Sequence, residues 1–306
     1  MSVEYAIIIK DKTRLEALIE RFNTKAQARF YIESGGGDFA EYEEEHQVFY
    51  ESLNALQSRL TPLLKYKIVE KAFLPSFLFA NNQLIIVIGR DGVVANTAKY
   101  ANGVPIVAVN PDQARYDGVL LPFDPNSFIG GVKSVLNQQC QLKEVRFAEA
   151  RLNDGQRLLA FNDLFIGAAT HVSARYRISY QERQEVHSSS GVIVSTQAGA
   201  TGWMSSVFNM AQGLLRLSQQ KVAIPRPELH SHELLFTVRE PFKSVATQTE
   251  VTVGLINDRA PLTIESMMPG GGVIFSDGVE ADFLAFNSGS VATIGVAEER
   301  AALVVG

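Results

Sequence analysis

Residues 84–110 read LIIVIGRDGVVANTAKYANGVPIVAVN, and this stretch decides the fold. The apolar runs LIIVIG at 84–89 and PIVAVN at 105–110 are predicted to be buried strands. The segment between them, from about Val93 to Ala101, is predicted to be a helix. A strand, a helix and a second strand at this spacing indicate a βαβ unit on a parallel sheet.

The same alternation extends over the first 140 residues. YAIII at 5–9 predicts a buried strand, and the apolar residues of 13–22 have the spacing of one helix face. The segment from GGG at 35–37 through the acidic tract EYEEEH is expected to be a loop that runs into a solvated helix start. The helix itself is predicted over about 47–64, and another over 124–136.

From about Leu142 the pattern changes to short segments in which apolar and polar residues alternate, as in half-buried antiparallel strands. One helical pattern, at about 200–217, interrupts them. We therefore predict an N-terminal Rossmann-like α/β domain over 1–140, which carries the GRDG turn, and an antiparallel, β-rich, sandwich-like domain over 141–306. The extreme C-terminus is a candidate to pack back on the first domain.

Composition excludes several classes of protein. The 306 residues are 46% hydrophobic and 20% charged, which is globular, and the net charge of -5 argues against a nucleic-acid partner. Cys140 is the only cysteine, which fits a reducing compartment. The N-terminus has no signal-peptide pattern, and no apolar stretch approaches the ~20 residues that span a bilayer. We therefore expect a cytoplasmic protein with neither membrane nor nucleic acid as a partner.

The turn Gly89-Arg90-Asp91-Gly92 is the first candidate site. Glycine tolerates positive φ and lets a ligand reach the main chain. A helix that begins after the turn points free N–H groups at whatever lies there. Asp91 is suited to orient or deprotonate a hydroxyl nucleophile, or to hold Mg²⁺. A tight turn without any function explains the same residues equally well.

A second candidate is AFNDLFIG at 160–167, in which Asn162 and Asp163 interrupt an apolar strand. These two polar side chains form either part of a site or an Asx turn at a strand end. FSDG at 275–278 predicts a plain Asp-Gly turn. Neither segment, taken alone, specifies a chemistry.

A third candidate is SSSGVIVSTQAGATGWMSS at 188–206, where a strand enters a loop of small residues before a helix. Thr196, Thr201 and main-chain N–H groups are donors that suit a nucleotide. Trp203, the only tryptophan, either stacks on a base or belongs to the core.

Taken together, these motifs resemble the NAD kinase family. G-x-D-G after an apolar strand, an Asn-acid pair on a strand, and G-x-I-x-S-T-x-x-G-x-T before a helix occur here in the family's order. Similarity is greatest to the mitochondrial-type branch, and it is carried also by PIVAVNPDQARYDGVL, LLFTVREP and PGGGVIFSDG. The resemblance covers residues 87–282, and the fold it implies agrees with the two domains predicted above.

The resemblance implies transfer of the ATP γ-phosphoryl group to the 2′-hydroxyl of the adenosine ribose of NAD, giving NADP. Asp91 stands at the position of the family's essential aspartate, which orients that hydroxyl and accepts its proton. Phosphoryl transfer otherwise depends on positioning and charge neutralisation, so Mg²⁺ is expected to bind with ATP. A homodimer is also implied.

The resemblance also assigns binding roles. Asn162 and Asp163 would hold ribose hydroxyls, while Thr201 and Trp203 would bracket the adenine. Ser190 replaces an acidic residue that, in many members, reads the adenine amino group from a neighbouring subunit. The predicted cofactor-binding residues are Gly89, Arg90, Gly92, Asn110, Asn162, Asp163, Ser190, Thr196, Thr201 and Trp203.

The sequence departs from the family at the central motif, where Gly-Gly-Asp-Gly-Thr reads Gly-Arg-Asp-Gly-Val. If the second position requires positive φ, Arg90 strains the backbone by about 1–2 kcal/mol; if it points outward, its charge can neutralise a phosphate. Asp163 is one methylene shorter than the family's usual glutamate. Three functions remain open: an NAD kinase, a kinase for another hydroxyl acceptor, and a non-catalytic NAD- or NADP-binding protein with a degenerate loop.

His230 and His232 are the one pair of residues that suggests a metal. We expect the two side chains to lie on a strand and to face opposite sides of it. We therefore predict no metal site built from protein side chains.

Overall fold

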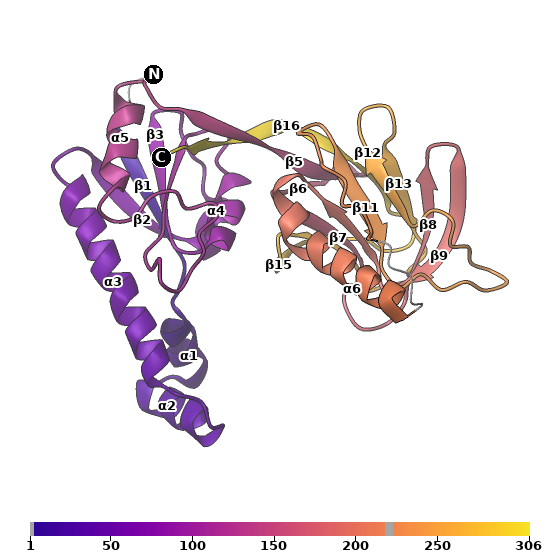
Figure 1. Cartoon of the computed structure of the whole chain (residues 1–306), viewed down its shortest axis with the longest axis horizontal. Coiled ribbons are helices and arrows are strands. Elements are labelled where there is room, and N and C mark those ends of the chain that lie inside the picture. Colours follow the sequence, from indigo (N-terminus) through magenta and orange to yellow (C-terminus); the bar gives the residue numbers. More distant parts are fainter. Residues whose placement is uncertain (1–2, 218–222) are drawn as a thin grey trace. The chain divides into compact units, whose positions relative to one another are not determined.

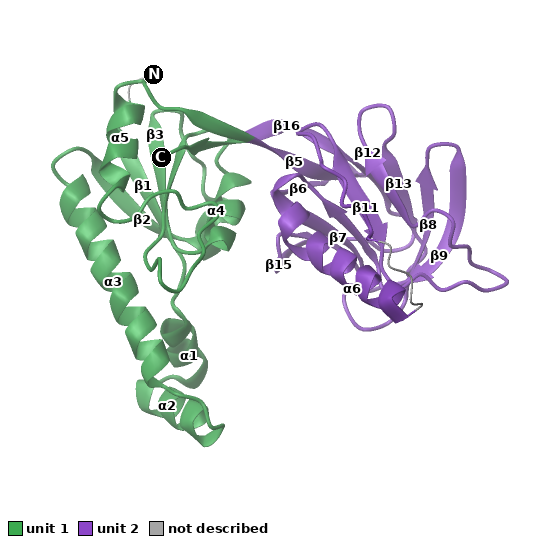
Figure 2. Ribbon diagram, viewed as in Figure 1, with its two compact units in different colours: residues 1–144, 301–306 green, residues 145–300 purple. Residues whose placement is uncertain are grey.

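The computed structural model describes residues 3–217 and 223–306 (Figure 1). The chain divides into two compact units, one of residues 1–144 with 301–306 and one of residues 145–300 (Figure 2). Unit 1 is an α/β unit and unit 2 is β-rich and antiparallel, so the predicted fold class is confirmed. No helix within the described residues has the length and apolar character needed to cross a membrane.

Unit 1 is built on a parallel sheet in the order β2-β1-β3-β4. The strands are β1 (Tyr5–Lys10), β2 (Lys65–Glu70), β3 (Gln83–Ile88) and β4 (Ile106–Val109). β3 and β4 pair in parallel, which confirms the βαβ unit predicted over 84–110. Both strands are almost wholly buried, as parallel strands covered by helices on each face must be.

Helices cover both faces of this sheet (Figure 1). The α-helices are α1 (Arg14–Phe22), α2 (Lys25–Ser34), α3 (Ala40–Leu60), α4 (Asp91–Ala98) and α5 (Phe128–Leu136), and a 3-10 helix, η1, spans Lys71–Ser76. Apolar residues of α3 and α5 share one buried cluster with the sheet, whereas α4 contacts β1 and β3 from the other side. Thr13 begins α1 with a capping box closed by Glu16.

The long helix α3 corrects the sequence analysis. The acidic tract 41–46, expected to be a loop, lies inside this helix, which begins at Ala40 and ends at Leu60. Glu41 and Glu43 occupy its first turn, where the helix N–H groups stabilise carboxylates. Glu45 faces inward and is only 6% exposed. Residues 25–34, which the sequence analysis left unassigned, form α2.

Unit 2 is a sandwich of two antiparallel sheets. One contains β8 (Ala174–Tyr180), β9 (Arg183–Ser189), β13 (Leu262–Ser266) and the first part of β16 (Val291–Val304), with β5 (Leu142–Leu152) and β6 (Arg157–Ala160) alongside. The other has the order β12-β11-β10-β7-β14-β15: Val253–Ile256, Leu234–Val238, Val192–Ser195, Asp163–Ala168, Gly272–Ser276 and Val279–Ala285. Between β10 and β11 lie the 3-10 helix η2 (Ala198–Thr201) and α6 (Trp203–Leu217).

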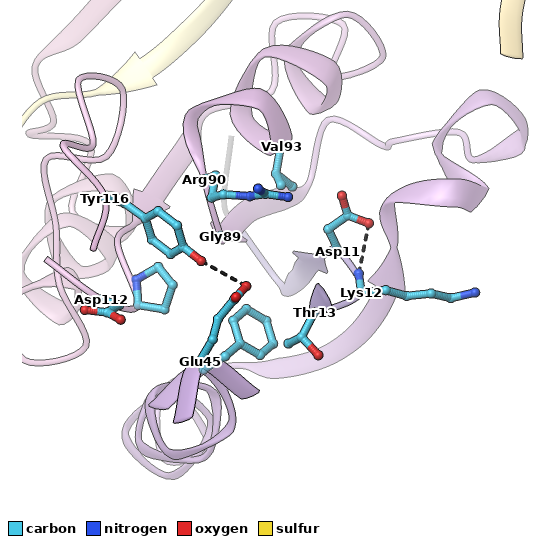
Figure 3. A pocket seen from close by; sticks show the side chains of 11 residues that line it. Asp11, Lys12, Thr13, Glu45, Gly89, Arg90, Val93, Asp112 and Tyr116 are labelled. Atoms are coloured by element: carbon cyan, nitrogen blue, oxygen red, sulfur yellow. Dashed lines mark hydrogen bonds between the residues drawn. The ribbon is translucent and has the colours of Figure 1, made fainter. Parts of the chain in front are cut away.

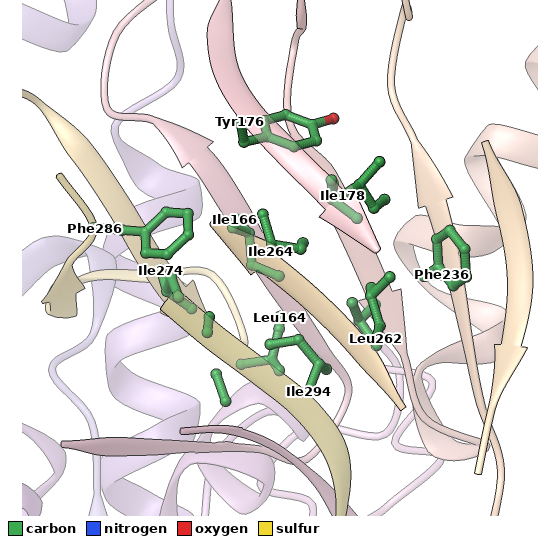
Figure 4. Packing of buried hydrophobic residues seen from close by; sticks show 14 of the residues in the cluster. Leu164, Ile166, Tyr176, Ile178, Phe236, Leu262, Ile264, Ile274, Phe286 and Ile294 are labelled. Carbon is green, nitrogen blue, oxygen red and sulfur yellow. The ribbon is translucent and has the colours of Figure 1, made fainter. Parts of the chain in front are cut away.

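The core of unit 2 lies between its two sheets (Figure 4). Leu164 and Ile166 of β7 and Ile274 of β14 come from one sheet, while Tyr176 and Ile264 come from the other. All five side chains belong to one buried cluster. Each such buried side chain stabilises the folded state by roughly 1.5–3 kcal/mol, and together they hold the two sheets face to face.

Substitution of Gly272, the first residue of β14, tests how closely the main chain of that strand packs against the main chain at Phe286. A Cβ at Gly272 would lie 1.9 Å from the carbonyl oxygen of Phe286, so Gly272→Ala must force the main chains apart. We expect a loss of at least about 2 kcal/mol of unfolding free energy, measured by urea denaturation. Gly295→Ala is the control, because Gly295 is also in a strand and a Cβ there meets nothing within 4 Å. Equal stability of the two variants would contradict the packing described.

Candidate functional site

Polar residues of unit 1 gather at the carboxyl ends of its parallel strands. Ligands of open parallel sheets bind at this edge, outside the strand ends. Here the residues that follow the four strands line a hollow of about 430 Å³. They are Asp11 after β1, Lys71 after β2, Arg90, Asp91, Gly92 and Val93 after β3, and Arg115, Tyr116 and Asp117 after β4. A smaller cavity of about 30 Å³ shares several of these residues (Figure 3).

Only Gly89 and Arg90 of the GRDG motif lie between β3 and α4. Gly89 has φ 156°, and a Cβ there would lie 3.0 Å from Cγ2 of Val93, so the position favours glycine. Arg90 has φ -95° and ψ 165°, an extended conformation that any residue adopts. The backbone strain considered for Arg90 is therefore absent. Its exposed side chain lines both hollows instead.

Asp91 is the first residue of α4, and the main chain holds its carboxylate in place. Oδ1 of Asp91 accepts a hydrogen bond of 2.6 Å from the N–H of Leu120. Leu120 belongs to the loop of residues 111–121, which follows β4. The free N–H groups at the start of α4 also favour a negative charge here. Asp91 thus has a set position at the edge of the larger hollow.

Asn110, predicted to bind the cofactor, uses its side chain to shape the 111–121 loop. Its Nδ2 donates to the carbonyl of Tyr116 at 3.0 Å, and its Oδ1 accepts from the N–H of Asp112 at 3.0 Å. Gly118 packs against it with φ 63°, where a Cβ would lie 2.5 Å from Asn110 Nδ2. Both ends of the Asn110 amide are therefore engaged within the protein.

In unit 2, Asp277 organises the Asn162-Asp163 segment. Its carboxylate accepts from the main-chain N–H groups of Phe161 at 3.0 Å, Asn162 at 2.6 Å and Asp163 at 3.3 Å. Asp277 and Gly278 form the turn between β14 and β15 with φ of 53° and 69°, so the Asp-Gly turn is confirmed. The turn has a second use that the sequence analysis missed, which is to fix a predicted binding segment.

Asp163 is a buried carboxyl group, with 8% of the residue exposed. Burial raises the pKa of Asp163 to about 7, and the nearby Asp277 carboxylate contributes to the rise. At neutral pH the Asp163 carboxyl is therefore divided between its protonated and ionised forms. In the protonated form it can donate a hydrogen bond as well as accept one.

The small-residue loop packs directly on this segment. The Thr196 hydroxyl donates to the carbonyl of Phe161 at 2.6 Å and accepts from the N–H of Gly199 at 3.1 Å. A Cβ at Gly199 would lie 2.0 Å from the carbonyl oxygen of Asn162, so only glycine allows this approach. Thr196 therefore holds the loop, whereas Thr201, at the end of η2, is exposed.

Trp203 and Ser190 line a different hollow of unit 2, of about 770 Å³. The Trp203 indole is stacked on Phe165, with centroids 5.9 Å apart and planes at 13°. The guanidinium of Arg239 lies 5.4 Å from the indole centroid, a cation–π contact. Trp203 is half-buried, so it both packs on the core and faces the hollow. Ser190 is exposed at the rim of the same hollow.

The two histidines are arranged differently from the expectation. His230 and His232 lie at a turn before β11 and not on a strand, and their rings stack with centroids 5.8 Å apart. The expectation that they face opposite sides of a strand was therefore wrong. Within the described residues, no group of three or more His, Cys, Asp or Glu side chains is placed to hold a metal ion.

The structure thus brings the predicted residues together within each unit. Gly89 to Gly92 line one hollow of unit 1, and the segments around Asn162 and Thr196 pack on each other in unit 2. Sequence reasoning missed Asp11, Lys71 and Arg115 in unit 1. Their place directly after parallel strands was the signal that could have found them.

The pKa of Asp163 predicts a pH-dependent stability. The pKa of Asp163 is higher in the folded state, at about 7, than in the unfolded state, at about 4. The protonated carboxyl therefore contributes its full stabilisation to the native state below about pH 4, and this contribution is lost as the pH rises through about 7. Between pH 5 and 8 the unfolding free energy of the parent protein should fall by on the order of a few kcal/mol, and that of Asp163→Asn should not show this fall. Urea unfolding across this range measures the difference. The exposed Asp258→Asn should follow the parent, and an Asp163→Asn variant that also follows it would refute the shift.

Comparison with known proteins identifies relatives of this arrangement. No family model matches the chain. Over 167 residues the chain is 29% identical to an NAD kinase of Heliobacterium modesticaldum. The match covers 52% of this chain and 52% of that protein, so the chain spans about half the length of the curated relative it matches.

Two solved structures resemble the whole chain. The crystal structure of a yeast NADH kinase complexed with NADH has a TM-score of 0.59 at 12% identity, covering 100% of this chain and 84% of that one. An NAD kinase from Archaeoglobus fulgidus, solved in complex with ATP, has a TM-score of 0.56 at 13% identity, covering 98% of this chain and 93% of that one. The chain therefore has the fold of these kinases.

Proposed function

We propose that this chain is an NAD kinase-like phosphotransferase, which moves the ATP γ-phosphoryl group to the 2′-hydroxyl of the NAD adenosine ribose to give NADP. The observation that carries the proposal is Asp91, set at the start of α4 by the Leu120 N–H beside a hollow lined by cations. The similarity to a curated NAD kinase and the shared fold support it.

One carboxylate and three cationic side chains of the unit 1 hollow have a part in the proposed reaction. Asp91 orients the 2′-hydroxyl and accepts its proton as the new O–P bond forms, while the bond from the γ-phosphorus to the β,γ-bridging oxygen breaks and ADP leaves. Phosphoryl transfer further requires that the charge of the phosphates be neutralised. In the described part of the chain Arg90 has no ion pair with an acidic side chain, so its guanidinium is available to a phosphate. Lys71 and Arg115, which pair with acidic neighbours, add positive charge nearby.

Mg²⁺ is proposed to enter with ATP. Mg²⁺ in such sites keeps several waters and is held by substrate phosphates with one or two carboxylates. The carboxylate of Asp11 lines the same hollow as Asp91 and would supply one such ligand. When bound, the ion supplies charge neutralisation of the phosphates.

Unit 2 is proposed to bind NAD. The Asn162-Asp163 segment, held by Asp277, is assigned to ribose hydroxyls. Thr201 and Trp203 are assigned to the adenine, with Ser190 at the same rim as Trp203. Asp163 is one methylene shorter than glutamate, and the protonated form of its carboxyl can donate to a ribose oxygen.

Three finer points belong to the same proposal. The segments PIVAVNPDQARYDGVL, LLFTVREP and PGGGVIFSDG support placement in the mitochondrial-type branch, and a phylogeny of the relatives tests this placement. The chain is proposed to form a homodimer, which light scattering of the purified protein tests. A cytoplasmic location, which the composition suggested, is tested by subcellular fractionation.

Replacement of the proposed base tests the mechanism. Asp91→Asn keeps the size of the side chain but removes its ability to accept the proton, so NADP formation should fall by about 10²–10⁴-fold. A coupled assay with NAD, ATP and Mg²⁺ measures the rate, and thermal melting confirms that the variant folds. Asp258→Asn, an exposed change of the same kind, should keep the parent rate. Unchanged turnover in a folded Asp91→Asn would refute the role of Asp91.

Binding measurements separate the kinase from a non-catalytic binding protein. The extended backbone of Arg90 removes strain as an argument for a degenerate loop. If the chain is a kinase, calorimetry on Asp91→Asn should give dissociation constants for NAD and ATP within about threefold of the parent values, because the aspartate acts in the chemical step. A parent protein that binds NAD or NADP tightly, yet neither binds ATP nor turns over, would favour the binding protein instead.

A further inference from the structure

We propose that Glu45 of helix α3 is a positioning residue, which holds the 111–121 loop so that Leu120 keeps Asp91 in its working orientation. The inference rests on the proposed function, because it concerns how Asp91 is set. Glu45 is the one acidic residue of the 41–46 tract that is buried.

Glu45 is buried and fully engaged. Its Oε1 accepts a hydrogen bond from the Tyr116 hydroxyl at 3.1 Å (Figure 3). Its Oε2 accepts from Nε of Arg14 and lies 3.7 Å from a guanidinium nitrogen of Arg115. A carboxylate with 6% exposure is stable only with such partners. Two of the three partners belong to the 111–121 loop.

Arg115 and Pro111 fasten the same loop to α3. Arg115 donates through Nε to Asp112 at 3.2 Å and lies 3.5 Å from Glu44 of the helix. The hydroxyl of Ser52, about two turns further along α3, donates to the carbonyl of Pro111 at 2.8 Å. The loop is therefore attached to α3 along its first half, and Glu45 is the buried centre of the attachment.

The second half of the loop carries this attachment to Asp91. The Tyr116 carbonyl is held by Asn110, and Gly118 turns the chain with φ 63°. Two residues later, Leu120 donates its N–H to Asp91 at 2.6 Å. Glu45 therefore acts on Asp91 through the loop.

The Tyr116 hydroxyl is suited to a permanent contact. Burial raises the pKa of Tyr116, and the negative charge of Glu45 raises it further. The hydroxyl therefore stays protonated through the neutral range and remains a donor to Glu45. The contact is a constant support and not a pH switch.

The variant Tyr116→Phe tests the proposal, because it removes one hydroxyl and leaves the ring in place. We expect kcat to fall by about tenfold while the KM values for NAD and ATP change by less than about threefold. A displaced base stabilises the transition state less well but leaves substrate binding unchanged. Glu45→Gln should act in the same direction. Glu51→Gln, on the exposed side of the same helix, should keep the parent kcat.

Two further readouts distinguish positioning from a general loss of structure. Hydrogen exchange of the 111–121 segment in the ligand-free protein should be faster in Tyr116→Phe and unchanged in Glu51→Gln. In the Asp91→Asn background, Tyr116→Phe should cause no additional loss of turnover, because both changes act on the same group.

The proposal is overturned if folded Tyr116→Phe keeps kcat within about twofold of the parent, or if its loss persists in full in the Asp91→Asn background. Should Glu45→Gln fail to fold, Tyr116→Phe alone decides the question. A parent protein that forms no NADP would instead refute the proposed function, and an active Asp91→Asn would refute the role of Asp91. Both results are separate from an inactive Asp91→Asn with an unaffected Tyr116→Phe.

Discussion

The hydrogen bond from the Leu120 N–H to the Asp91 carboxylate is the contact on which the candidate site of unit 1 depends. It joins the start of α4, which follows β3, to the loop that follows β4. The parallel pairing of β3 and β4 places these two segments side by side. Because Gly89 lets the strand enter the helix directly, Asp91 lies at the helix start, where its charge is stabilised.

In unit 2 the Asp277 carboxylate also accepts hydrogen bonds from main-chain N–H groups. Asp277 accepts three main-chain N–H groups and so fixes the segment that contains Asp163. Burial makes ionisation of the Asp163 carboxyl costly, and the nearby Asp277 carboxylate adds to this cost. In both units, then, an acidic side chain bonded to main-chain N–H groups determines where a predicted functional residue lies. In unit 2 this arrangement has a cost in stability at neutral pH, because it keeps the Asp163 carboxyl buried.

Local pattern predicted much of this fold. The βαβ unit over 84–110 is confirmed because buried parallel strands are apolar throughout and therefore stand out. The predicted start of α3 was wrong because an acidic tract next to GGG resembles a solvated loop. Such residues also stabilise a helix N-terminus, and Glu45 is buried only because Arg14, Arg115 and Tyr116 surround it. Asp277 went unrecognised because its partners lie more than a hundred residues away, 114 in the case of Asp163.

The sequence by itself determined the strands, most helices and the motifs around Asp91, Asn162 and Thr196, because apolar periodicity and glycine placement are local properties. Only the tertiary structure decided that Arg90 is unstrained and that Glu45 faces the 111–121 loop. Backbone torsion at a turn and the burial of a charge depend on neighbours that the fold supplies from distant parts of the chain. These contacts cannot be read from spacing along one segment.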